Sequence, residues 1–536
     1  MPERVVLVGY GPVGARLIDG LLPAVRDGRI DLTVVGAEPH DVYNRVLLAE
    51  YAVGRTDRAG LDMDDRRVAE QAGVRFHLAT TVVGVDRHRR VVRLHDGIPL
   101  DYDRLVLATG ARANVPTLAG MERARRDRAS VSTAPDNLDL GGAPLPRGVV
   151  ALRDLADAEN VRAAVSAGQR IVVLGAGVLG MELALAAAEA GAEVVVAYHS
   201  AAPMNRTLDE NGGRVLASSA TAVGVEMAHH ARAESLLLRH DDHGHAWFDG
   251  LVCADGKVLA GDLLVLSCGV AARTEVASLA GLAISTGILV DGSSRSWTDP
   301  DVFAIGDCAH VADPADADSH GRVPGGPSGL VGPGWRQADR LAALLSTGVA
   351  AAAPGSANGF AAASPVPVPV ERPGVVMLKA EGVDVVAGGD VDADPFAHAP
   401  GCHGPQVTIW ADPARGAYVK LVTVEGVLTG FVAVGMPRTG AELTLLFERG
   451  SELPADRSAL LRLDAPDAGM TVVADPFAAD ATVCWCNGVS AGAIREAATA
   501  GEPTIACVKA STRAGTGCGG CVGRITELLA RETVPA

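Results

Sequence analysis

An internal repeat constrains the fold of this chain more than any other feature of its sequence. Residues 5–14 read VVLVGYGPVG, and residues 171–180 read IVVLGAGVLG. In a second pair, DGIPLDYDRLVLATGA at 96–111 and DGKVLAGDLLVLSCGV at 255–270, the matching residues recur at one constant offset. Two long copies indicate two related domains, because solenoid repeats are shorter and more numerous.

Each copy begins with an apolar strand, a GxGxxG turn and a helix. We expect the strands at 5–8 and 171–174, and the helices from about Val13 and over 181–190. The apolar residues of the first helix recur with a helical period: Leu17, Ile18, Leu21 and Leu22. This is the order of the βαβ unit that binds dinucleotides, so the sequence predicts an α/β protein with two Rossmann-like domains.

The glycines of the two turns have separate predicted roles. The first makes the tight turn, the second lets the backbone approach a pyrophosphate, and the third lets helix and strand pack closely. The candidates are Gly9, Gly11 and Gly14 in the first turn and Gly175, Gly177 and Gly180 in the second. A single GxGxxG could also be a plain glycine-rich turn, but both motifs here lie between a strand and a helix.

The residue that ends the second strand of a βαβ unit distinguishes the dinucleotides. Glu38 lies 24 residues after Gly14, where a carboxylate binds a ribose hydroxyl, although a solvated Glu at a strand end is the alternative. The second copy has Tyr198, His199 and Ser200 there, with no acid. The choice between NADH and NADPH therefore stays open.

The segment 298–307, TDPDVFAIGD, ends an apolar strand in Gly-Asp, and 108–110 reads ATG. With these motifs the chain resembles the two-dinucleotide flavoprotein oxidoreductases of the glutathione-reductase-like superfamily. The resemblance implies FAD in the first domain, with Asp307 on its ribityl chain. It places Thr109 and Gly110 where the chain crosses between domains, and it implies that the NAD(P)H domain interrupts the FAD domain.

The segment 43–48, YNRVLL, resembles ferredoxin and rubredoxin reductases and nitrite reductase large subunits. That resemblance implies that Arg45 touches FAD, with a surface arginine as the alternative. Glu182, two residues after Gly180, matches a glutamate near the nicotinamide and is the candidate catalytic residue. No cysteine precedes Cys253, so we expect no thiol mechanism on the flavin face.

Five of the nine cysteines lie between residues 484 and 521. Four follow the pattern C-x-C, 31 residues, C-x-x-C: Cys484, Cys486, Cys518 and Cys521. Four thiolates can hold either a [2Fe-2S] cluster or zinc. The stretch CWCNGVSAGAIREAATAG with AGTGCGGC resembles the [2Fe-2S] domain of bacterioferritin-associated ferredoxin, which implies the cluster and these four ligands. Cys507 does not fit the pattern and is expected to be a buried thiol.

The remaining sequence suggests a small α+β domain and a small helical C-terminal domain. The α+β part resembles the C-terminal domain of nitrite reductase large subunits and rubredoxin reductases. The expected limits are an FAD domain at 1–112 and 271–345, an NAD(P)H domain at 113–270, a linker at 346–370, the α+β domain at 371–461, a linker at 462–480 and the [2Fe-2S] domain at 481–534.

The net charge of −17 argues against nucleic acid or an anionic membrane as the main partner. The chain shows no signal peptide and no apolar stretch of about 18 residues free of Gly or charge, so a cytoplasmic location is expected.

The whole chain resembles the N-terminal part of NAD(P)H nitrite reductase large subunits and the electron transfer subunit of assimilatory nitrate reductase. Only fifteen residues follow Cys521, so we expect the terminal reduction on another protein, a molybdopterin nitrate reductase or a nitrite reductase subunit. One alternative is a ferredoxin or rubredoxin reductase that serves another acceptor. The other is a redox-sensing or iron-handling protein of low turnover.

Overall fold

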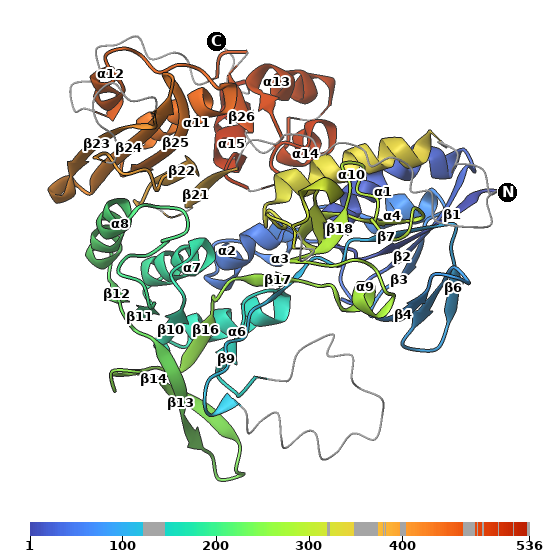
Figure 1. The fold of residues 1–536 in the computed structure, drawn as a ribbon, viewed down its shortest axis with the longest axis horizontal. Helices are drawn as coiled ribbons and strands as arrows, with labels where there is room; N and C mark the ends of the chain where they lie inside the picture. The colour runs from blue at the N-terminus through green and yellow to red at the C-terminus, as the bar shows by residue number, and fades with distance from the viewer. Residues whose placement is uncertain are drawn as a thin grey trace.

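The computed structural model describes residues 1–121, 145–318, 322–347, 374–378, 380, 382–396, 404–464, 477–479, 481–484, 487–501, 503–517 and 519–532. These residues form two parallel five-stranded sheets, one antiparallel five-stranded sheet and a small C-terminal unit that is mostly helical (Figure 1). The α/β fold class is therefore confirmed.

The first parallel sheet has the order β19-β7-β1-β2-β3. Its strands are β1 (Glu3–Val8), β2 (Ile30–Val35), β3 (Arg75–His77), β7 (Arg104–Leu107) and β19 (Val302–Ala304). Helix α1 (Pro12–Arg26) follows the first turn, and all four residues of its predicted apolar face are buried. It packs against α10 (Val331–Ser346), whose inner face includes Ala338 and Leu341.

The second parallel sheet repeats this arrangement in the order β12-β11-β10-β16-β9. Its strands are β9 (Val149–Val150), β10 (Ile171–Leu174), β11 (Val194–Ala197), β12 (Val225–Ala228) and β16 (Leu263–Leu266), and its helices are α6 (Leu155–Ser166), α7 (Val178–Glu189) and α8 (Glu210–Ala222). Strand β16 lies beside β10 as β7 lies beside β1. The two motifs of each repeat copy therefore lie on neighbouring parallel strands, in the same arrangement in both sheets.

Each copy also carries a small antiparallel sheet of three strands. These are β4 (Val82–Asp86), β5 (Val91–Leu94) and β6 (Pro99–Asp101) in the first copy, and β13 (Ala233–His240), β14 (Ala246–Cys253) and β15 (Val258–Ala260) in the second. The remaining short helices are α2 (Leu48–Ala52), which packs against α6 and α7 of the second copy, α3 (Arg58–Leu61), α4 (Arg66–Gln71) and α9 (Glu275–Leu279).

The chain leaves the first sheet and returns to it along one antiparallel pair of strands. Strand β8 (Ala111–Ala113) pairs with β17 (Val270–Ala272). After the return, β18 (Ile288–Val290) pairs with β20 (Ala309–Val311), and β19 completes the first sheet beside β7. The first sheet is thus built from strands that precede the second copy in the sequence and from one strand, β19, that follows it.

The third sheet is antiparallel, with the order β21-β22-β25-β24-β23. Its strands are β21 (Val375–Leu378), β22 (Val385–Gly389), β23 (Gln406–Asp412), β24 (Ala417–Val424) and β25 (Val427–Val434). Helix α11 (Pro437–Arg449) packs Phe447 on Phe431 of the sheet. Helix α12 (Ser458–Leu461) and the turn at Arg462–Asp464 follow. Of the predicted linkers, 348–370 and 465–476 lie outside the described residues.

The C-terminal unit has a hydrophobic core of its own. Its elements are β26 (Thr482–Cys484), β27 (Val489–Ser490), α13 (Ala491–Ala500), α14 (Ile505–Thr512) and α15 (Val522–Glu532). Its core residues include Val483, Ile494, Val508, Ile525 and Leu528. Across the described part of the chain, no helix combines the length and the apolar character that a membrane span requires.

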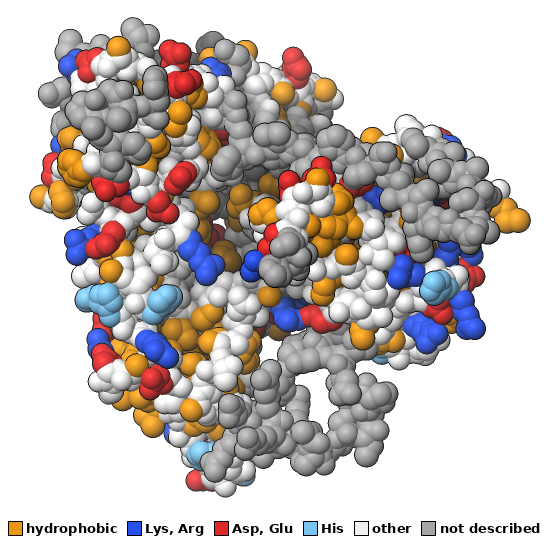
Figure 2. Space-filling model, in the orientation of Figure 1, with side chains coloured by type: hydrophobic (Ala, Val, Ile, Leu, Met, Phe, Trp, Pro, Cys, Tyr) orange, Lys and Arg blue, Asp and Glu red, His pale blue; other side chains and the backbone are white. Residues whose placement is uncertain are grey.

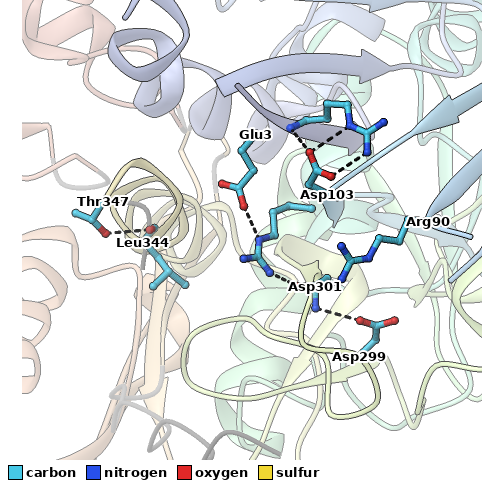
Figure 3. Close-up of polar contacts among 9 residues, drawn as sticks. Glu3, Arg90, Asp103, Asp299, Asp301, Leu344 and Thr347 are labelled. Carbon is cyan, nitrogen blue, oxygen red and sulfur yellow. Dashed lines mark hydrogen bonds and ion pairs between the residues drawn. The ribbon is translucent and has the colours of Figure 1, made fainter. Parts of the chain in front are cut away.

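An ion-pair network connects β1, β7 and β19 at their amino-terminal ends, at the opposite end of the first sheet from its glycine turn (Figure 3). Asp301, just before β19, accepts from Arg104 at the start of β7 and from Arg90. Arg104 Nε also donates to Glu3 Oε1 of β1 at 2.8 Å. The Asp301 side chain is mostly buried, so its carboxylate neutralises guanidinium groups that water screens only in part.

Asp301→Asn should lower the free energy of unfolding by about 3 kcal/mol, because the mostly buried Arg104 guanidinium loses one of its two carboxylate partners and keeps only Glu3. Urea denaturation followed by circular dichroism measures this change. The matched control is Asp101→Asn, whose pair with Arg4 is largely exposed and should cost less than about 1 kcal/mol. Equal losses in the two variants would show that burial does not strengthen the Asp301 network.

Candidate dinucleotide and cluster sites

A cavity of about 2410 Å³ lies at the carboxyl ends of β1 and β7. Residues of the first glycine turn and of the 305–307 segment form one part of its wall, and Val178, Leu179 and Glu182 of α7 form another. Figure 2 shows the surface hollowed near the centre of the molecule, with hydrophobic side chains inside. The cavity exceeds the roughly 300–1,000 Å³ of an ordinary ligand pocket, so it has room for an extended dinucleotide and a second ligand.

The first glycine turn has the geometry that its three glycines predict. Gly9 has a φ of 117°, and a Cβ there would collide with the carbonyl oxygen of Ala108. A Cβ on Gly14 would collide with the carbonyl oxygen of Gly9. Gly11 faces open space and begins α1 without a side-chain cap, so the first backbone N–H groups of the helix can receive a phosphate.

The second glycine turn has the same geometry. Gly175 has a φ of 113°, and a Cβ there would meet the carbonyl oxygen of Ser267. Gly180 packs against the carbonyl of Gly175, while Gly177 faces open space at the uncapped start of α7. These three glycines do not line the large cavity, which α7 reaches through Val178, Leu179 and Glu182. A second pyrophosphate would therefore lie at the edge of the cavity.

Glu38 and Arg45 lie together in the cavity wall and are paired with each other. The hydroxyl of Tyr43 also donates to Glu38 Oε2 at 2.7 Å, and Arg45 donates to the carbonyl oxygen of Arg153 at 2.9 Å. Burial acts to raise the pKa of Glu38, but Arg45 and the Tyr43 hydroxyl hold it below its ordinary value. Glu38 is therefore a carboxylate at neutral pH, as a ribose-binding acceptor must be.

Asp307 lies in the turn Gly306–Cys308 and lines the same cavity. Its Oδ2 accepts from Arg153 at 3.0 Å. The backbone N–H of Gly306 donates to Gln337 Oε1 of α10 at 2.7 Å, which fixes the turn against the helix. Arg153 lies two residues before the start of α6 and lines the cavity, although nothing in the repeat pattern predicted it.

Thr109 and Gly110 line the cavity at the crossing between the two copies. The hydroxyl of Thr109 donates to the carbonyl oxygen of Arg273 at 2.9 Å, so it ties the outgoing strand to the returning one. Burial, together with Arg45 and Arg112, lowers the pKa of Arg273. The two neighbouring guanidinium groups are each paired with a carboxylate of the cavity wall, Arg45 with Glu38 and Arg112 with Glu275.

Glu182 is 6% exposed and reaches the cavity from α7, so the structure brings it to the cavity that Asp307 lines. Cys268 also lines the cavity, at the place in the second copy that Thr109 has in the first. Burial raises the pKa of the Cys268 thiol to about 11. This cysteine is therefore a protonated thiol at neutral pH and a poor nucleophile.

In the C-terminal unit, Cys484 and Cys521 are both buried and share one core. The side chain of Asn487 lies with its Nδ2 3.7 Å from Cys484 Sγ. The other two predicted ligands, Cys486 and Cys518, lie outside the described residues. Within the described part of the chain, no three His, Cys, Asp or Glu side chains are grouped for a metal ion.

The expectation that Cys507 is a buried thiol is wrong, because the structure leaves its side chain half-buried. Its Sγ lies 3.8 Å from the carbonyl oxygen of Ala497. Cys507 lies on α14, and its thiol faces the end of α13.

The chain belongs to the pyridine nucleotide-disulphide oxidoreductase family, whose model matches residues 3–326. Residues 482–531 match a BFD-like [2Fe-2S] binding domain. The predictions of an FAD-dependent NAD(P)H oxidoreductase and of a [2Fe-2S] cluster are therefore confirmed, and the match favours iron over zinc.

Among relatives, the nitrite reductase [NAD(P)H] large subunit of Klebsiella oxytoca is 30% identical over 98% of this chain. The assimilatory nitrate reductase electron transfer subunit of Bacillus subtilis is 26% identical over 98% of it. The chain covers 48% and 59% of these relatives, so it spans about half their length. A putidaredoxin reductase–putidaredoxin complex shares the fold, with a TM-score of 0.65, 21% identity and coverage of 85% of this chain and 95% of that chain.

Proposed function

We propose that this protein takes hydride from NADH or NADPH and delivers electrons, through FAD and a [2Fe-2S] cluster, to a separate terminal reductase. One observation carries the proposal. A single cavity joins the first glycine turn, Asp307 and Glu182, in a chain that also contains a [2Fe-2S] binding domain. FAD accepts two electrons as hydride and a [2Fe-2S] cluster carries one, so the pair converts hydride into single electrons.

The residues have separate roles in this proposal. Gly11 and the start of α1 bind the FAD pyrophosphate, Glu38 binds the adenosine ribose, Arg45 touches FAD, and Asp307 holds the ribityl hydroxyls. The second glycine turn binds the NAD(P)H pyrophosphate, and Glu182 positions the nicotinamide. The four cysteines 484, 486, 518 and 521 hold the cluster. The domain limits predicted from the sequence are part of the proposal.

A nitrate or nitrite reductase is the acceptor that we propose, in the form of a molybdopterin nitrate reductase or a nitrite reductase subunit. The supporting observation is the extent of similarity. The relatives named for nitrate and nitrite reduction match 98% of the chain, including its C-terminal half. The biphenyl dioxygenase system ferredoxin–NAD(+) reductase component of Paraburkholderia xenovorans matches only 58%. A ferredoxin-reductase-type enzyme for another acceptor is the second candidate.

Reconstitution with candidate acceptor proteins tests the proposal. The purified holoprotein, with NADH or NADPH, should drive nitrate or nitrite reduction by the partner enzyme at several turnovers per second or more. A ferredoxin and a rubredoxin serve as alternative acceptors. Faster reduction of those two would favour the second candidate. Turnover below about one per minute with every acceptor would favour a redox-sensing or iron-handling protein.

A further inference from the structure

The C-terminal unit is in direct contact with the part of the chain that surrounds the first glycine turn. Asn44 is 5% exposed, and its side chain donates to the carbonyl oxygen of Gly517. Gly519 lies against Leu47 so closely that a Cβ on it would be 2.8 Å from Leu47 Cδ2. Gly517 and Gly519 flank Cys518, so this contact involves the segment that carries two predicted cluster ligands.

The residues at 44–48, here called the bridging turn, have two faces. Asn44 and Leu47 contact the C-terminal unit. Arg45, Val46 and Leu48 line the large cavity on the other side. The turn is a single 3-10 turn at Arg45–Leu47, and Asn44 Oδ1 caps it by accepting from the backbone N–H of Val46 at 3.0 Å. One turn of backbone therefore separates the cavity from the segment around Cys518.

An ion pair holds the two parts together beside this turn. Arg513, at the end of α14, donates to Asp19 Oδ2 of α1 at 2.9 Å. Figure 1 shows α14 above the pair of helices α1 and α10. The carbonyl oxygen of Arg513 accepts from Asn487 Nδ2 at 2.8 Å, and this same nitrogen lies near Cys484 Sγ. Arg513 therefore connects the surroundings of a cluster ligand to α1.

We propose that the bridging turn is the docking platform on which the [2Fe-2S] domain receives electrons, and that Asp19 and Arg513 hold the domain there. Asn44, Leu47, Asp19 and Arg513 are thus positioning residues for electron transfer inside one chain. This inference rests on the proposed function. For each NAD(P)H oxidised to NAD(P)⁺, one proton goes to solvent and two electrons cross the turn in two single steps, each reducing the cluster once before it passes the electron to the acceptor.

Charge reversal tests this docking in the holoprotein. Asp19→Arg and Arg513→Asp should each leave NAD(P)H-driven bleaching of the flavin unchanged in anaerobic stopped-flow measurements. Subsequent bleaching of the cluster should slow at least tenfold, and the double variant should recover most of the rate. The matched control is Asp27→Arg, an exposed reversal at the end of α1 that should change neither rate. Cluster bleaching at the wild-type rate in both single variants would overturn the inference.

Hydrogen exchange gives a second measurement that needs no bound cofactor. In the apoprotein, the backbone amides of Val46 and Leu47 should exchange at least tenfold faster in each single variant, and the double variant should restore their protection. Unchanged exchange in both single variants would overturn the docking contact. A wild-type cluster that NAD(P)H never reduces would instead contradict the proposed function, and exchange would still decide whether the two parts are docked.

Discussion

Replacing Cys518 with serine is expected to reduce transfer to the protein acceptor by orders of magnitude and to leave flavin reduction by NAD(P)H nearly intact. A change of one ligand alters both the assembly and the potential of an iron–sulfur cluster. None of the described residues of the C-terminal unit lines the dinucleotide cavity, so hydride transfer should not depend on the cluster. Steady-state turnover with the acceptor protein, beside stopped-flow flavin reduction, measures the two effects separately.

The matched control for this variant is Cys507→Ser, because Cys507 is a half-buried thiol outside the cluster pattern. It should keep both activities. Small dyes that take electrons directly from flavin should still be reduced by the Cys518→Ser protein. Full transfer to the acceptor in that variant would mean that the cluster is not the exit route and that the chain is a flavin reductase with a structural tail.

Asp307→Ala is expected to lose FAD while keeping its iron. Asp307 lies in the cavity beside Arg153, and the proposal gives it the ribityl hydroxyls of the cofactor. A hydrogen bond donated by a hydroxyl to a charged carboxylate contributes about 1.5–3 kcal/mol, so FAD should bind roughly ten- to a hundredfold more weakly. The flavin-to-protein ratio after gel filtration measures the loss, and iron analysis shows whether the C-terminal unit is intact.

The control for Asp307→Ala is Asp316→Ala, an exposed aspartate in the turn Pro314–Asp316. It should retain flavin at the wild-type ratio. If Asp307→Ala also retained a full complement of flavin, the role given to the Gly-Asp motif at 306–307 would be wrong.

Local sequence patterns predicted the parts of the fold that depend on local stereochemistry. The strand at Ile171–Leu174 lies where the apolar run placed it, and α1 buries Leu17, Ile18, Leu21 and Leu22. Gly9 and Gly175 have the positive φ that the turn requires. These features could be predicted because turn geometry and helical period are set by neighbouring residues. Helix α7 begins three residues earlier than predicted, at Val178, because the helix starts within the glycine turn itself.

Contacts between distant residues could not be predicted in this way. Arg153 and Asp307 are 154 residues apart, and Asn44 and Gly517 are 473 apart. No periodicity links such positions, since only the packing of whole elements brings them together. The pair Glu38–Arg45 was predicted only in part. Both residues were predicted as FAD contacts, but their contact with each other was not.

The most direct test of the central claim is the order in which the two redox groups are reduced. The holoprotein, with flavin and iron contents measured beforehand, is mixed anaerobically with NADH or NADPH and followed by diode-array stopped flow. The account predicts that the flavin absorbance falls first and that the [2Fe-2S] absorbance falls later, at a rate independent of nicotinamide concentration. Loss of cluster absorbance before the flavin, or a protein with one equivalent of zinc and no iron, would contradict it.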